Sequence, residues 1–182
     1  MRADSHREAA EQLALVREHG APMGDAERVA VLEECSEQAY HAGQPDRALA
    51  MPREAVAIRR TLGDPRATSA SLRWLSRIPW WTRDRAGAEA AGDEAAALVR
   101  DGPPTRELAM AESNLYQLHM LTQRDEEAVA RGRHAMALAE RLGDVETLVH
   151  AKTNVGTSIM RTRFDEGHAL PEDAARQAME AG

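Results

Sequence analysis

The segment Ala137-Leu138-Ala139-Glu140-Arg141-Leu142-Gly143-Asp144 is the most informative about the fold, because it ends an Ala/Leu-rich run with a glycine and this ending recurs. Comparable glycines stand at Gly63, Gly102 and Gly182, so the spacings between successive glycines are 39, 41 and 39 residues. A break followed by an acidic helix start recurs at a similar period, at Gly43-Gln44-Pro45-Asp46, Thr82-Arg83-Asp84, Gln123-Arg124-Asp125 and Arg163-Phe164-Asp165. The period indicates stacked two-helix units, because each unit buries its apolar face only against its neighbours.

The expected architecture is all-α: a right-handed superhelical stack of antiparallel helix pairs, with about four repeats of ~40 residues each. We expect one helical-repeat domain over residues 1–182 that begins with a leading helix at 5–19. The repeats are predicted at 26–62, 65–100, 106–142 and 145–181. The short linkers between the helices favour antiparallel neighbours.

Three prolines fall inside the expected helices. A proline in a helix interior removes a backbone donor and clashes with the preceding turn, which costs about 3 kcal/mol. We therefore expect a kink or an early end at Pro79, and breaks at Pro52 and Pro171. A kink at Pro79 would direct Trp80 and Trp81 either into the groove of the stack or into the gap that the kink opens.

Composition argues against several classes of function. The net charge of −7 disfavours direct contact with nucleic acid, because an acidic surface repels phosphates. The sequence has no apolar run near 18 residues, and the start Met1–His6 lacks the apolar core of a signal peptide. Cys35 is the only cysteine, which excludes an intrachain disulfide and a thiolate metal cluster. We expect a cytoplasmic protein without membrane association.

The pair pattern resembles the tetratricopeptide repeat (TPR). The third repeat shows the pattern best, with Asn114-Leu115-Tyr116 in its first helix and the small residues Ala128 and Ala135 in its second. The fourth repeat has Asn154-Val155-Gly156 and Ala175 at comparable places. Small residues suit these positions because paired helices cross closely there.

Longer stretches resemble the helical-repeat region of large actinobacterial LuxR-type ATPase regulators. They are Arg73–Arg77, Arg106–Ala111, Ser113–Leu115, Ala137–Asp144 and Val149–Ala151. In that family, such a region is an arm between a nucleotide-binding domain and a DNA-binding domain, so the resemblance implies sensing of an inducer or binding of a partner. This sequence has no Gly-x-x-x-x-Gly-Lys-Ser/Thr loop and no basic recognition helix, so no ATPase or DNA-contacting residue carries over.

The first helix of each pair is expected to line the concave face, where a mixture of apolar and polar side chains suits a small organic molecule or a peptide. Each of these residues has packing between helices as its alternative role. The predicted ligand-binding residues are Glu37, Tyr40, His41, Leu72, Ser76, Trp80, Trp81, Met110, Ser113, Gln117, Met120, His150, Thr153, Thr157 and Arg161.

Catalytic chemistry has little support in the sequence. Glu37 and His41 lie one helical turn apart and are the candidate base and its orienting partner, although such pairs are common on solvated helix faces. The histidines form no zinc-binding motif, and Cys35 is expected to be a core thiol. We expect no cofactor and no metal.

Two functions remain open. The first is a ligand- or protein-binding arm of regulatory type, resembling the LuxR-type arm without its ATPase or DNA-binding domains. The alternative is a small stand-alone biosynthetic enzyme or accessory protein that binds an apolar small molecule in the groove. With either function, the uncapped last repeat could pair with a second copy of the chain through Ala174, Ala178 and Met179.

Overall fold

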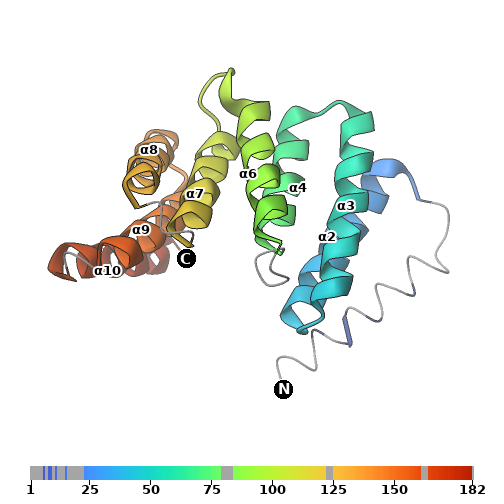
Figure 1. Ribbon diagram of the computed structural model, residues 1–182, viewed down its shortest axis with the longest axis horizontal. Helices are drawn as coiled ribbons and strands as arrows, with labels where there is room; N and C mark the ends of the chain where they lie inside the picture. The colour runs from blue at the N-terminus through green and yellow to red at the C-terminus, as the bar shows by residue number, and fades with distance from the viewer. Residues whose placement is uncertain are drawn as a thin grey trace. The chain divides into compact units, whose positions relative to one another are not determined.

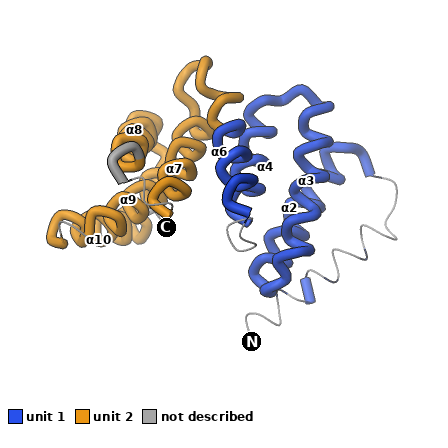
Figure 2. Tube along the Cα trace, in the orientation of Figure 1, with its two compact units in different colours: residues 1–95 blue, residues 96–182 orange. Residues whose placement is uncertain are grey.

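The computed structural model describes residues 6, 8, 9, 11, 15, 23–78, 84–121, 125–160 and 164–181. Within these residues the chain forms eight long helices and no strand, which confirms the all-α prediction. The chain divides into two compact units, Met1–Ala95 and Ala96–Gly182 (Figure 2). The leading helix predicted at 5–19 lies mostly outside the described residues, and the single-domain organisation stays a prediction.

Unit 1 contains α2 (Asp25–His41), α3 (Pro45–Leu62), α4 (Pro65–Arg77) and most of α6 (Arg85–Arg100). Helices α2 and α3 lie side by side as an antiparallel pair (Figure 1). Gly43 makes the reversal between them, because its φ of 71° is left-handed and unfavourable for residues with a Cβ atom. The Gln44 amide then donates to the Ala39 carbonyl at 2.9 Å and closes the end of α2.

Unit 2 contains the end of α6 followed by α7 (Arg106–Leu121), α8 (Asp125–Leu142), α9 (Val145–Ile159) and α10 (Phe164–Ala181). The pairs α7–α8 and α9–α10 pack directly, and α8 also contacts α9. Gly143 ends α8 with a φ of 65°, and the Asp144 amide donates to the Ala139 carbonyl at 3.0 Å. The recurring glycine ending thus has a conformational cause at this position.

Each unit has its own apolar core between paired helices. In unit 1, Val29 and Leu32 of α2 pack with Met51 of α3, and Cys35 is buried there as predicted. In unit 2, Tyr116 of α7 packs with Val155 of α9 and its neighbours. These helices are stable mainly because packing buries their apolar faces.

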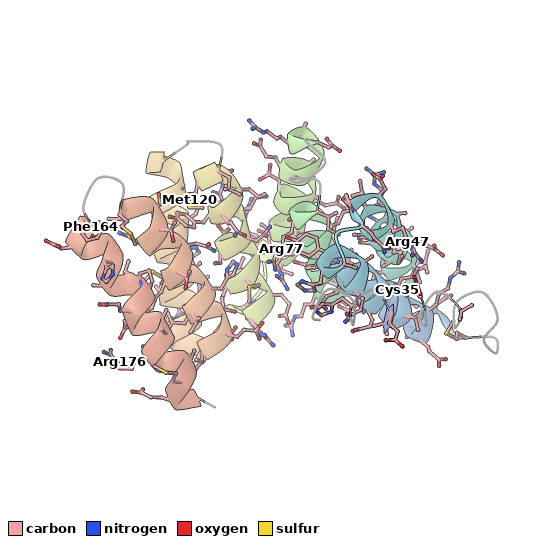
Figure 3. All side chains as sticks on the ribbon, turned by 90° about the horizontal axis from the view of Figure 1, so that it is seen from below. Cys35, Arg47, Arg77, Met120, Phe164 and Arg176 are labelled. Atoms are coloured by element: carbon pink, nitrogen blue, oxygen red, sulfur yellow. The ribbon has the colours of Figure 1, made fainter. Side chains whose placement is uncertain are left out.

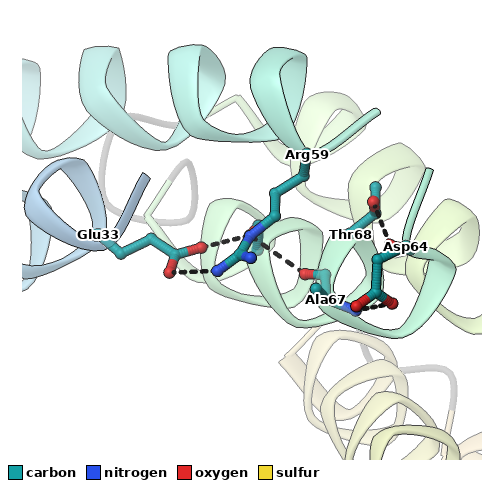
Figure 4. A network of polar contacts seen from close by, with 6 residues as sticks. Glu33, Arg59, Asp64, Ala67 and Thr68 are labelled. Atoms are coloured by element: carbon teal, nitrogen blue, oxygen red, sulfur yellow. Dashed lines mark hydrogen bonds and ion pairs between the residues drawn. The ribbon is translucent and has the colours of Figure 1, made fainter. Parts of the chain in front are cut away.

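A polar network joins α2, α3 and α4 of unit 1 (Figure 4). The Arg59 guanidinium of α3 lies 3.3 Å from the Glu33 carboxylate of α2. The Ser71 hydroxyl of α4 donates to the same carboxylate. At the start of α4, the Asp64 carboxylate accepts hydrogen bonds from the Arg66 and Ala67 amides, as an N-cap residue does. Charge-assisted bonds to one partly buried carboxylate therefore set how three helices meet.

The prediction of breaks at Pro52 and Pro171 is wrong. Helix α3 continues through Pro52, and α10 continues through Pro171. Helix α4, by contrast, ends at Arg77, which agrees with an early end near Pro79 although Pro79 itself lies outside the described residues. Tertiary contacts explain why α3 and α10 continue through their prolines.

Pro52 leaves the Ala48 carbonyl without its usual donor within the helix, because proline has no N–H. The Ser36 hydroxyl of α2 donates to this carbonyl at 2.8 Å, and the bond is buried. The Trp74 indole of α4 donates in turn to the Ser36 hydroxyl at 2.8 Å. A chain of two hydrogen bonds across three helices thus replaces the missing one, so the buried carbonyl is satisfied.

Pro171 is accommodated by close packing. A Cβ atom placed on Gly156 of α9 would lie 2.4 Å from Pro171 Cδ and 2.6 Å from the Gly167 carbonyl oxygen. A Cβ atom on Gly167 would lie 2.3 Å from the Met160 backbone nitrogen. Two glycines therefore let α9 and α10 approach so closely that the region around the proline is filled by backbone.

Candidate functional site

A mainly apolar cavity of about 360 Å³ lies in unit 1, where the turn between α2 and α3 meets the end of α4. It is lined by Tyr40, His41, Gly43, Pro45 and Ile78. Of the predicted ligand-binding residues, Tyr40 and His41 meet here. The volume is at the lower end of the range for small-molecule pockets, so it suits a small compound or one large apolar side chain.

The Tyr40 ring forms one wall of the cavity, and neighbouring aromatic rings hold it in place. The Tyr40 ring meets the Trp74 ring edge-on, with 5.6 Å between the centroids, and meets the His41 ring edge-on at 5.4 Å. Trp74 is fixed by its hydrogen bond to Ser36 and by the Arg77 guanidinium, which lies 5.5 Å from the indole centroid. The wall is therefore preorganised, which lowers the entropic cost of binding.

The polar groups near the cavity are open to solvent. The Glu37 carboxylate lies 3.8 Å from His41 Nε2, and both side chains are about half exposed. The His6 ring lies 5.1 Å from the His41 ring, and His6 Nδ1 is 2.6 Å from the Gln38 side-chain oxygen. Solvent weakens such a pair, so the geometry gives little support to activation of a base by Glu37 and His41, and the contact of Glu37 with a ligand stays a prediction.

The other predicted residues of unit 1 are placed differently. Leu72 is buried in the core with Val56 and Ala95, and the buried Ser76 hydroxyl donates to the Arg73 carbonyl. The structure therefore gives both residues a packing role, and their contact with a ligand stays a prediction. Trp80 and Trp81 lie outside the described residues.

In unit 2, the buried Ser113 hydroxyl lies 2.7 Å from Nδ1 of the half-buried His150 ring. The Asn154 amide lies 3.3 Å from the same nitrogen. Because Ser113 is fully buried, this contact joins α7 to α9 and does not present a hydroxyl to a substrate. Met110 is also buried.

The remaining predicted residues of unit 2 differ in burial within the described part of the chain. Gln117 and Met120 are half-buried, and Met120 packs on the core around Tyr116. Thr153 and Thr157 are exposed on α9, where the Thr157 hydroxyl donates to the Thr153 carbonyl at 2.7 Å. Arg161 lies outside the described residues.

The surface predicted to pair with a second copy is only partly exposed. Ala174 is buried within unit 2, whereas Met179 is 77% exposed and Ala178 is also exposed. The exposed Phe164 ring at the start of α10 stacks on His168 (Figure 3). Pairing through α10 stays a prediction, without Ala174 as a contact.

Sequence reasoning missed three residues of the unit 1 cavity. Gly43 and Pro45 mark the break between two helices, and Ile78 comes directly after α4. A signal for Gly43 and Pro45 was present, because the turn of a helix pair lies beside the next helix of a stack. Ile78 carries no such signal, since its position depends on where α4 ends.

Within the described residues, no helix is long and apolar enough to cross a membrane. In the same part of the chain, no three His, Cys, Asp or Glu side chains gather closely enough to hold a metal ion.

Known proteins resemble this chain in structure. No protein family matches the sequence, and no curated protein matches it. Two crystal structures of a kinesin light chain-like protein with nearly identical TPR-like repeats from Podosopora anserina are similar over 99% of this chain and 90% of theirs. Their TM-scores are 0.70 and 0.68, at 16% and 15% identity.

The crystal structure of BtubC from P. vanneervenii is also similar, with a TM-score of 0.69 at 19% identity. The match covers 99% of this chain and 73% of that one. At these identities the likeness concerns the fold and not the function. The chain therefore has a TPR-like helical-repeat fold.

Proposed function

We propose that this chain is a protein-binding helical-repeat module whose unit 1 cavity receives a large apolar side chain of a partner segment. The observation that carries this proposal is the apolar cavity between Tyr40, His41 and Ile78, whose aromatic wall is held by Trp74. Aromatic side chains around a desolvated pocket are typical of the few residues that dominate the affinity of an interface. The TPR-like fold is consistent with a binding scaffold.

A small apolar molecule is the second candidate occupant, because the cavity volume also suits one. The regulatory role follows from the resemblance to LuxR-type arms alone. If both are right, an apolar inducer would occupy the same cavity and compete there with a protein segment.

The test uses the three isoleucines of the chain as reporters, because only Ile78 lines the cavity. Ile58 packs on the unit 1 core and Ile159 lies in the unit 2 core. The methyl signals of isoleucine-labelled protein would be followed during titration with peptides that carry one Leu, Phe or Trp, and with terpenoid and polyketide-like compounds. We expect a saturable shift of the Ile78 signal, while the other two signals stay in place.

Tyr40→Ala should weaken this binding at least about tenfold, because truncating a ring at the centre of a contact costs about 2 kcal/mol or more. The matched control is Leu62→Ala, which truncates an exposed residue of α3 in the same unit. A response to peptides favours the protein partner, and a response to compounds alone favours the small molecule. If no probe moves the Ile78 signal, or if all three signals move together, the cavity is not the binding site.

A further inference from the structure

A second cavity, of about 530 Å³, lies within unit 2 and was not predicted from the sequence. The end of α6, the start of α7 and one face of α8 form its walls. Leu108 and Leu138, both buried, contribute apolar surface. The cavity can therefore shelter the apolar body of a small molecule.

The charged residues of this cavity are mainly basic. Arg100, Arg131 and Arg141 line it together with His134, and Glu112 is the one carboxylate among the lining residues. The chain as a whole carries a net charge of −7, so the charge of this cavity is opposite in sign to that of the whole chain. Such a local field attracts anions.

Glu112 neutralises one of the three arginines. Its carboxylate is almost fully buried and lies 2.9 Å from the Arg131 guanidinium, which is 34% exposed. Burial without a partner would be very unfavourable for Glu112, so this pair stays closed and holds Arg131 in place. The exposed side chains of Arg100 and Arg141 have no carboxylate partner within the described part of the chain.

The other arginines that the structure describes in unit 2 are paired. Among the described residues outside the cavity, Arg106 pairs with Glu146, Arg133 lies 3.9 Å from Glu166, and Arg176 pairs with Asp173. Unpaired guanidinium groups in this unit therefore occur together at the cavity, in contrast to the paired arginines elsewhere on its described surface.

Equivalent positions in the two units differ in how their arginine is paired. In unit 1, the Arg60 guanidinium of α3 lies 2.6 Å from the Glu94 carboxylate of α6. The residues 40 positions further along the chain are Arg100 and His134, at the same places in their helices. An arginine stands at both positions, and histidine occupies the place that the carboxylate has in unit 1, so the Arg100 guanidinium is available to an external anion.

We propose that this cavity binds an organic anion: a compact apolar body on Leu108 and Leu138 with a carboxylate or phosphate against Arg100 and Arg141. The planar guanidinium group matches both anions because it can donate two parallel hydrogen bonds. The site belongs to unit 2 alone and does not depend on the cavity of unit 1.

Titration calorimetry with phenyl phosphate and phenylacetate tests the proposal, with benzyl alcohol as the uncharged analogue and inorganic phosphate as the anion without an apolar body. We expect binding of phenyl phosphate or phenylacetate that weakens as salt is added, and no measurable binding of benzyl alcohol. The comparison of the two anions identifies the preferred head group. Tighter binding of the aromatic anions than of inorganic phosphate supports the apolar contact.

Arg100→Gln and Arg141→Gln should each weaken binding about tenfold or more, since each removes charge-assisted hydrogen bonds. Arg133→Gln is the matched control, because it removes the same charge from the same helix as Arg141 but outside the cavity. His134→Glu restores the ion pair of unit 1 and should abolish binding. Failure of wild type to bind either aromatic anion, equal loss in the Arg133 variant, or full binding by His134→Glu would overturn the proposal.

Discussion

The helix pairs α2–α3 and α9–α10 both accommodate a proline inside their second helix, but they do so in different ways. Each second helix has a proline as its eighth residue, Pro52 in α3 and Pro171 in α10. In the first pair, a buried serine hydroxyl donates to the carbonyl that the proline leaves free. In the second pair, Gly156 and Gly167 bring the two backbones together around the proline.

The difference shows two ways in which a helix tolerates an internal proline. The neighbouring helix can supply a hydrogen-bond donor, or glycines without a Cβ atom can make space for the proline ring. A hydroxyl satisfies the free carbonyl directly and links it to Trp74, so the first solution is polar. The second solution depends on the absence of two Cβ atoms, so it is steric. The two pairs should therefore respond to different substitutions.

The largest effect on the free energy of unfolding is expected for Gly156→Ala in the α9–α10 pair. The added methyl group would meet Pro171 and the Gly167 backbone well inside contact distance, so α9 and α10 must separate. We expect a loss of about 3 kcal/mol in the free energy of unfolding, measured by urea denaturation. Gly102→Ala is the control, because a Cβ atom there meets nothing closer than 3.9 Å. Equal stability of the two variants would contradict the close approach.

A smaller effect on the free energy of unfolding is expected for Ser36→Ala in the α2–α3 pair. This change removes the donor to the Ala48 carbonyl and the acceptor for the Trp74 indole, which should cost about 2 kcal/mol in unfolding free energy. Ser69→Ala is the control, because Ser69 donates to the Ala95 carbonyl of α6, where no proline lies four residues further on. It should cost about 1 kcal/mol.

A double-mutant cycle sharpens this prediction. In Pro52→Ala, residue 52 regains its amide and can donate to the Ala48 carbonyl, so Ser36→Ala should then cost about 1 kcal/mol less. The measurement is again urea denaturation. Additive effects of the two substitutions would mean that the serine does not replace the bond lost at Pro52.

The smallest effect is a dependence of stability on pH that arises in the α9–α10 pair. The Lys152 ammonium of α9, hydrogen-bonded to the Asp173 carboxylate of α10, lowers the pKa of that carboxyl, and Arg176 lowers it further. The contribution to stability is therefore present above the ordinary aspartate pKa of about 3.9 and is lost as the pH falls through the lowered folded-state value.

Asp173→Asn should flatten the decline of the urea midpoint as the pH falls below about 5, because it removes the titrating group. Lys152→Met, which removes the partner, should flatten it in the same range. The effect is small because solvent screens the partly exposed Asp173. An unchanged pH profile in both variants would show that the pair does not contribute.

The helix pairs could be predicted because their signals are local. Gly63 and Gly143 end helices with left-handed φ values of 72° and 65°, a conformation that glycine adopts easily. Asp64 and Asp144 then cap the next helices through their own side chains. Each signal acts within a few residues of the position it determines.

The candidate sites were less predictable because they depend on contacts between distant residues. Tyr40 and His41 were expected at a binding surface and do line a cavity, but Ile78 joins them only because α4 ends beside the α2–α3 turn. The cavity of unit 2 was missed because single arginines resemble solvated surface residues. Their meaning appears only when the partner of each guanidinium is known.

The period, the helix ends and the all-α repeat could be predicted from the amino-acid sequence, because turns, caps and apolar spacing act locally. Contacts between helices, by contrast, let α3 and α10 pass through their prolines, and among the described residues they give Arg100 no carboxylate partner like that of Arg60. The physical reason is that the cost of a missing donor or an unpaired charge depends on groups contributed by other helices.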